Sequence, residues 1–215
     1  RDENLKFAAH NSKRDEFIFS QYKNVLKVTC DVLKAQVNAG RFKPSMFEVK
    51  LKDIASDEVL CCDLKDKTKF RLSGIIDRMD ELSVGDEKGC KKYIKIIDYK
   101  SGSSSAQMDI EKLFNGIQLQ MFVYMKIALR GLKSKDDKTE YLPGALYYQH
   151  VCNPVIKTGE ITGSIEDERL KKMRGNGIAI GDVSKGPNEN PVLEALDVDL
   201  EGSKPSKDAK ICLKT

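Results

Sequence analysis

Two apolar, strand-like segments lying close together in the sequence constrain the fold of this chain more than any other feature. Residues 69–82 and 91–100 are rich in isoleucine and other residues that favour strands. The residues between them include Gly and Asp, which suit a hairpin loop. This pattern predicts two neighbouring antiparallel strands in the centre of the chain.

The flanking segments predict further strands and helices around this hairpin. Apolar residues recur at three- and four-residue steps over 14–38, which predicts a helix that ends at Gly40 and Pro44. Ser164 is a suitable N-cap for a short helix, and Gly175 follows its end. The remaining predicted elements are a strand over 45–54, a long amphipathic helix over 108–132 and a strand over 144–151.

This order of elements predicts an α/β (α+β) fold in which a mixed sheet is flanked by helices. We expect one domain over residues 1–183, with the N-terminal helix at 14–38 and a core at 45–150. Residues 184–215 are rich in Pro, Gly and charged residues with little periodicity. They are predicted to form a polar loop or mobile arm.

Composition narrows the functional classes. Lys and Arg number 37 and Asp and Glu 33, so the net charge of +4 permits nucleic-acid binding without indicating it. No apolar run approaches the length of a membrane helix, so we expect a cytoplasmic protein without a membrane partner. The six cysteines include no CxxC pair, which argues against zinc and predicts reduced, mostly buried thiols.

The end of the second central strand carries the residues best suited to chemistry. Because side chains alternate along a strand, Asp98 and Lys100 project from the same face as Ile94 and Ile96. Asp77 follows the isoleucines of the preceding strand. If the two strands form a hairpin, Asp77 and Asp98 lie side by side.

Two adjacent carboxylates repel each other unless a cation lies between them. Mg²⁺ commonly binds one or two carboxylates and completes its shell with water and phosphate oxygens. A neighbouring lysine then stabilises attack on a phosphate, so the group predicts a phosphodiesterase site. The alternative is that Asp98 and Lys100 are an exposed ion pair of little consequence.

Three ordered motifs carry a resemblance to a known family. They are "GIIDRMD", with Gly74, Asp77, Arg78 and Asp80; "IIDYKSG", with Asp98, Tyr99 and Lys100; and "GIQLQMFVYM", with Gln120 and Tyr124. Together they resemble the RecB-like branch of the PD-(D/E)XK nuclease superfamily, and within it the AddB-like nuclease domains of AddAB helicase–nucleases. The resemblance covers most of residues 15–183 and implies a restriction-endonuclease-like fold.

The resemblance implies a role for each matching residue. Asp77 and Asp98 would be metal ligands, joined by the backbone carbonyl of Tyr99, and Lys100 would be the catalytic lysine. Glu48 matches an upstream acidic position and is either a further metal or water-shell residue or an outward polar residue of an edge strand.

Gln120 and Tyr124 lie four residues apart on the predicted long helix and therefore share one of its faces. In the family this face covers the active site, where the pair would orient the lysine, the metal shell or the DNA. The alternative is a polar patch on a packed helix.

Two family features find no match. Family members carry a metal-binding histidine in a G-x-x-x-H context, but His10 is too close to Asp77 and lacks that context, and His150 is expected to be structural. No cysteines have the spacing of the AddB-like iron–sulfur cluster. We therefore expect either a fragment whose full-length protein contains the cluster or a divergent homologue that has lost it.

The resemblance implies a Mg²⁺-dependent DNA exonuclease domain, with Mn²⁺ able to substitute. It would act within a helicase–nuclease that processes double-strand breaks for recombinational repair, with DNA and an AddA-like helicase subunit as partners. A non-catalytic nuclease fold used for DNA binding or assembly is the first alternative. An unrelated metal-dependent phosphohydrolase is the second.

Overall fold

A computed structural model describes residues 12–63, 65, 68–86, 89–102, 107–160, 163–180 and 191–196. Its main sheet has the strand order β1-β4-β5-β6-β7, and β2 and β3 pair separately. The strands are β1 (Lys43–Lys50), β2 (Cys61–Asp63), β3 (Lys69–Arg71), β4 (Ile75–Asp86), β5 (Gly89–Lys100), β6 (Glu140–His150) and β7 (Asn176–Ala179). The helices are α2 (Lys13–Ala39), α3 (Leu51–Ile54), α4 (Asp57–Leu60), α5 (Ile110–Phe114), α6 (Gln120–Lys135), α7 (Ile165–Lys172) and α8 (Pro191–Leu196), with a 3₁₀ turn at Thr158–Glu160.

The main sheet is mixed, which confirms the predicted fold class. β4 pairs antiparallel with both β1 and β5, and β7 pairs antiparallel with β6. β5 and β6 are parallel. A parallel pair requires a crossover connection, and α6 provides it.

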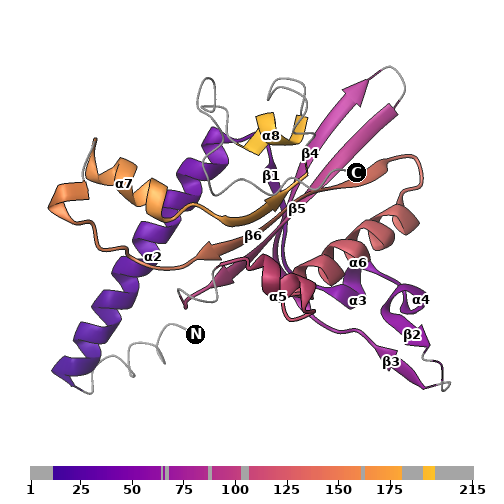
Figure 1. Ribbon diagram of the computed structural model, residues 1–215, viewed down its shortest axis with the longest axis horizontal. Coiled ribbons are helices and arrows are strands. Elements are labelled where there is room, and N and C mark those ends of the chain that lie inside the picture. The colour runs from indigo at the N-terminus through magenta and orange to yellow at the C-terminus, as the bar shows by residue number, and fades with distance from the viewer. Residues whose placement is uncertain are drawn as a thin grey trace.

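Helices cover both faces of the sheet (Figure 1). α6, with α3 and α4 beside it, packs on one face over the largest apolar core, which includes Met79, Ile96 and Met121. On the other face a smaller core joins α8 to the sheet through Phe42 and Leu82. Burial of these apolar side chains is the main stabilising contribution to both layers.

The predicted N-terminal helix is confirmed as α2, which begins after the Ser12 cap and ends before Gly40. Val28 and Val32 pack against Met173 beside α7, which anchors the C-terminal half of α2. The predicted Ser164 cap of α7 is also confirmed. Its hydroxyl accepts from the backbone N–H of Asp167 in a capping box.

The predicted long helix over 108–132 is wrong in its continuity. It is divided into α5 and α6, because Gly116 adopts a positive φ of 75° that an α-helix does not permit. The predicted apolar face is found in α6, where Met121, Met125 and Ala128 are buried. Ile117, within the predicted helix, is instead exposed in the connection between α5 and α6.

Two predicted strands are also shorter than expected. The strand over 45–54 ends at Lys50, and Leu51–Ile54 forms α3, whose Leu51 and Ile54 are buried under α6. The segment over 69–82 is divided between β3, which belongs to the small sheet, and β4. The pattern of apolar residues does not show where each of these strands ends. Packing decides the boundary, as in α3, where burial of the apolar side chains under α6 favours a helical turn.

Other predictions need correction. β4 and β5 extend to Asp86 and from Gly89, so the hairpin loop is shorter than the one predicted. Part of the predicted polar arm is helical, as α8, while residues 184–190 and 197–215 lie outside the described residues. Mostly buried thiols are not found among the described cysteines: Cys30, Cys61 and Cys90 are exposed and Cys152 is half-buried, all without disulfides.

Within the described residues, none of the helices combines the length and the apolar character needed to cross a membrane.

Candidate active site

The predicted acidic pair comes together at the ends of β4 and β5. The two strands pair antiparallel, with Arg78 opposite Ile97 and Met79 opposite Ile96. The next step of this register sets Asp77 opposite Asp98. Since cross-strand neighbours share a face, both carboxylates project on the side of the sheet that α6 covers.

Asp98 is a buried carboxylate with an incompletely satisfied oxygen. Its residue is 6% exposed, and within the described part of the chain Oδ2 accepts no well-directed hydrogen bond. Its partner is the Nζ atom of Lys100, which forms an ion pair with Oδ2 at 2.5 Å. Burial raises the pKa of Asp98 above its ordinary value, and repulsion by Asp77 adds to the rise, while Lys100 opposes it.

Lys100 is held between an acid and an aromatic ring. Its ammonium lies 5.7 Å from the centre of the Tyr148 ring, on the adjacent strand β6. Burial is the largest single influence on the pKa of Lys100 and lowers it. The attractions of Asp98, Tyr148 and Asp77 outweigh burial, so the pKa is raised and the lysine is cationic at neutral pH.

Asp77 is oriented by the backbone of the neighbouring strand. Its Oδ2 accepts a hydrogen bond of 2.8 Å from the N–H of Tyr99. Tyr99 lies between Asp98 and Lys100 in the sequence. Its backbone N–H therefore fixes Asp77 of β4 relative to both of these residues of β5. Preorganisation of this kind is characteristic of binding sites.

The donor set fits Mg²⁺. Asp98 supplies a buried oxygen that is ion-paired with the Lys100 ammonium, and Asp77 supplies a second carboxylate beside it. Across the described ranges no three His, Cys, Asp or Glu side chains converge on one point. Two carboxylates are nevertheless sufficient for Mg²⁺, which keeps several waters and uses phosphate oxygens.

Glu48 lies on the adjacent strand β1 in a strained conformation. The pairs Phe47–Arg78 and Val49–Ile76 set it at the level of Asp77, and its side chain is exposed. Its φ of 50° is left-handed, a region that glutamate rarely adopts. Strain of this kind is concentrated at functional sites, which supports the first of the two roles predicted for Glu48.

The strain at Glu48 has a measurable consequence. Replacing Glu48 by Gly should raise the free energy of unfolding by up to about 1 kcal/mol, because glycine adopts positive φ without steric cost. Glu48→Ala is the control and should give no gain, since alanine meets the same steric cost. Urea unfolding measures both values. A Gly variant no more stable than the Ala variant would contradict the strain.

Gln120 and Tyr124 share a face of α6, as predicted. The Gln120 amide donates to the Tyr124 hydroxyl at 2.9 Å. The Tyr124 ring packs against Gly74, where any Cβ would collide with the hydroxyl, so the glycine of "GIIDRMD" permits this contact. The contact places the pair beside the start of β4, three residues before Asp77.

A group of buried charges on the opposite face of the sheet was not predicted. Asp80 is fully buried and accepts two hydrogen bonds from Arg78, at 2.6 and 2.8 Å. The Nζ atom of Lys95 lies 2.9 Å from the same carboxylate. The sequence signal for such a group is a pair of opposite charges at facing positions of two apolar strands, here Asp80 and Lys95.

Of the two histidines, the structure describes only His150. His10 lies outside the described residues. His150 is the last residue of β6, at the register position beside Lys100, and is half-buried. Its expected structural role stays a prediction.

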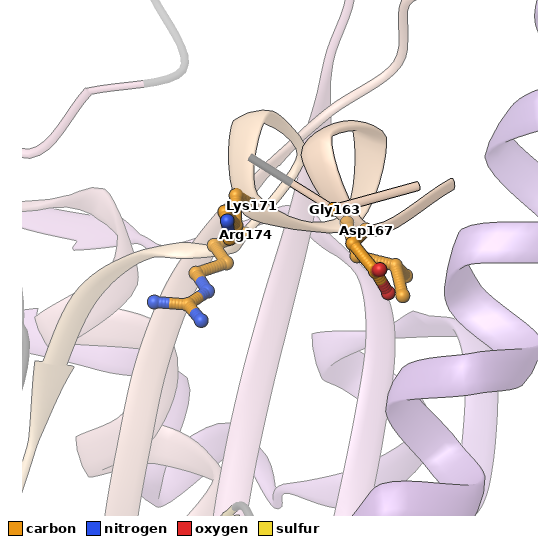
Figure 2. Close-up of a pocket in the computed structure, with 5 residues that line it drawn as sticks. Gly163, Asp167, Lys171 and Arg174 are labelled. Atoms are coloured by element: carbon orange, nitrogen blue, oxygen red, sulfur yellow. The ribbon is translucent and has the colours of Figure 1, made fainter. Parts of the chain in front are cut away.

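A separate pocket of about 370 Å³ lies at α7 and contains none of the predicted site residues. Figure 2 shows Lys171 and Arg174 on one side of it and Gly163 and Asp167 on the other. Lys171 pairs with Glu168, and Asp167 belongs to the capping box of α7. Because this lysine and this aspartate already have local partners, we assign the chemistry to the acidic pair.

Comparison with known proteins decides the family. A model of the PD-(D/E)XK nuclease superfamily matches residues 3–200, which is most of the chain. This chain belongs to the PD-(D/E)XK nuclease superfamily. The mixed sheet with flanking helices agrees with the restriction-endonuclease-like fold of this superfamily.

Relatives of this PD-(D/E)XK chain are named as a subunit of an ATP-dependent helicase/deoxyribonuclease. The protein from Clostridioides difficile is 32% identical over 178 residues, which are 82% of this chain and 15% of the relative. That from Clostridium acetobutylicum is 29% identical, over 90% of the chain and 16% of the relative. That from Staphylococcus haemolyticus is 31% identical, over 82% and 15%. The chain therefore spans about a sixth of the length of these relatives.

Proposed function

We propose that this chain is the metal-dependent DNA exonuclease domain of a helicase–nuclease. The observation that carries the proposal is the arrangement of Asp77, Asp98 and Lys100 at one strand end, in a chain of the nuclease superfamily. A buried carboxylate, Asp98, beside the half-buried Asp77 and a cationic lysine fits a divalent cation and a phosphodiester better than it fits a structural ion pair. The intact triad also disfavours a purely scaffolding role.

Each residue has a defined task in the proposed reaction. Asp77 and Asp98 would hold Mg²⁺, with the backbone carbonyl of Tyr99 as a further ligand and Glu48 as a residue of the metal or water shell. When bound, Mg²⁺ would polarise the scissile phosphate and lower the pKa of a water molecule. The Lys100 ammonium, held by Asp98, would offset negative charge that develops on the phosphate.

Gln120 and Tyr124 would support the site from α6. Their hydrogen bond and the contact of Tyr124 with Gly74 connect the start of α6 to the start of β4. We propose that Tyr124 fixes the position of β4, while the exposed Gln120 contacts the DNA strand or the water around the metal.

The names of the relatives support a role within a helicase–nuclease, and the resemblance to AddB-like domains suggests the wider context. We infer that the chain acts in a complex with an AddA-like helicase subunit, on DNA ends produced by double-strand breaks, in the cytoplasm. The iron–sulfur cluster of the AddB-like family would belong to the full-length protein and not to residues 1–215.

Metal-dependent cutting tests the proposal. With Mg²⁺, the 215-residue chain and the full-length protein with its helicase subunit should each be incubated with end-labelled linear single-stranded DNA. The full-length complex should degrade this DNA, and EDTA should stop it, because the carboxylate pair is inactive without a cation. The isolated chain is expected to cut more slowly.

Two further substrates separate the alternatives. Closed circular single-stranded DNA should remain intact, since an exonuclease requires an end. The isolated chain, without the helicase subunit, should not hydrolyse nucleoside triphosphates. Metal binding without any cutting of linear DNA would overturn the proposal in favour of a DNA-binding module. Hydrolysis of nucleotides by the isolated chain, with DNA untouched, would indicate an unrelated phosphohydrolase.

A further inference from the structure

The buried charge group Arg78–Asp80–Lys95 is connected to the acidic pair through a single tyrosine. Arg78 donates a long hydrogen bond of 3.4 Å from Nη1 to the Tyr99 hydroxyl. The N–H of the same Tyr99 donates to Asp77 at 2.8 Å. Tyr99 therefore links the two faces of the sheet. Its side chain lies on the face of the buried charge group, and its backbone N–H binds Asp77, whose side chain lies on the α6 face.

We propose that Arg78 and Tyr99 are positioning residues, and that the Arg78–Asp80–Lys95 group holds the end of β5 so that Asp77, Asp98 and Lys100 keep a geometry suited to a divalent cation. The inference rests on the proposed function, because it assigns these residues to the same site. Apart from the backbone carbonyl of Tyr99, which the proposed function makes a metal ligand, none of these groups needs to touch metal or substrate.

Burial makes this group rigid. Arg78 is 4% exposed and Asp80 is 0% exposed, so the two-pronged ion pair has little access to water that could replace it. Lys95 adds a second cation at 2.9 Å and lies 4.9 Å from the centre of the Phe42 ring. Each charge thus has a fixed partner, and the Arg78 guanidinium has one preferred orientation.

The guanidinium is needed for its shape as well as its charge. Its Nε and Nη2 atoms bind Asp80, which leaves Nη1 directed toward the Tyr99 hydroxyl. A lysine at the same position retains the positive charge but cannot bind the carboxylate and the hydroxyl in this forked geometry. The specific prediction is therefore that charge alone does not restore the site.

Direct Mn²⁺ binding tests the inference with a measurement that is independent of cutting. Electron paramagnetic resonance of Mn²⁺ should give a dissociation constant for the wild-type protein, Arg78→Lys and Tyr99→Phe. Arg78→Lys should weaken binding about 10-fold, in the range seen when residues that support metal ligands are changed. Tyr99→Phe removes only the hydroxyl and should weaken binding about fivefold, as expected for one lost hydrogen bond.

A matched control separates positioning from general destabilisation. Glu81 and Lys92 form a pair at 3.2 Å on the same two strands, farther from their functional ends. Lys92→Gln should leave Mn²⁺ binding unchanged. Circular dichroism at increasing temperature should show that Tyr99→Phe unfolds as the wild-type protein does.

The outcomes distinguish this inference from the proposed function. If wild-type protein neither binds Mn²⁺ nor cuts DNA, the proposed function fails. If it does both, and folded Tyr99→Phe and Arg78→Lys bind Mn²⁺ as tightly as wild type, only the positioning role is overturned. Weaker binding by both variants, with Lys92→Gln unaffected, supports it.

Discussion

Replacing Asp98 by Ala should abolish DNA cutting and metal binding together, whereas replacing Lys100 by Ala should abolish cutting and leave metal binding intact. Asp98 supplies the buried carboxylate of the pair, so its loss removes a proposed ligand. Lys100 is not a proposed ligand but a cation beside the site. We expect cutting to fall more than about 100-fold in each variant, as when a preorganised charge is removed from an active site.

The same strand offers a control for this pair of variants. Lys91 forms an exposed ion pair of 3.5 Å with Glu140, at the opposite end of β5 from Lys100. Lys91→Ala should cut DNA as the wild-type protein does. Rates of release from end-labelled DNA and Mn²⁺ binding would be measured for all variants. Cutting retained by either Asp98→Ala or Lys100→Ala would disprove the assignment of the active site.

Replacing Asp80 by Ala should destabilise the fold by about 3–5 kcal/mol, because it leaves Arg78 and Lys95 buried without their anion. Asp57→Ala is a matched control. Asp57 also lies 2.6 Å from an arginine, Arg71, but both side chains are more than half exposed, at 71% and 54%. Loss of this exposed pair should cost less than about 1 kcal/mol.

Urea unfolding at neutral and alkaline pH checks the prediction for Asp80 and its cause. Burial lowers the pKa of Lys95 below its ordinary value of 10.5, and Asp80 opposes this shift. Without Asp80 the pKa of Lys95 should fall further. Between that lowered pKa and 10.5 the unfolded chain binds more protons than the folded chain, so stability should rise with pH. Equal losses for Asp80→Ala and Asp57→Ala would show that burial of the charge group has no energetic effect.

The local pattern of the sequence was sufficient for much of the candidate site. Alternation along β5 placed Asp98 and Lys100 on one face, and the hairpin pattern placed Asp77 opposite Asp98, as the strand register confirms. Gln120 and Tyr124 were correctly predicted to share a helix face, which their hydrogen bond demonstrates. These features depend on the periods of strand and helix, which neighbouring residues largely determine.

Boundaries that depend on packing were predicted less well. Residues 51–54 were predicted as the end of a strand but form α3, since burial of Leu51 and Ile54 under α6 stabilises a helical turn there. Residues 108–132 have helical periodicity, yet Gly116 interrupts them. In both places distant contacts or one backbone angle outweigh the local preference.

The sequence by itself therefore determined the family, the class of fold and the acid, acid and lysine that define the proposed chemistry. Only the tertiary structure decided that Asp98 is desolvated, that Glu48 is strained beside Asp77, and that Arg78, Asp80 and Lys95 form one buried group linked to Tyr99. The physical reason is that side-chain periodicity is local. Desolvation and the pairing of charges instead depend on which strands and helices pack together across the whole chain.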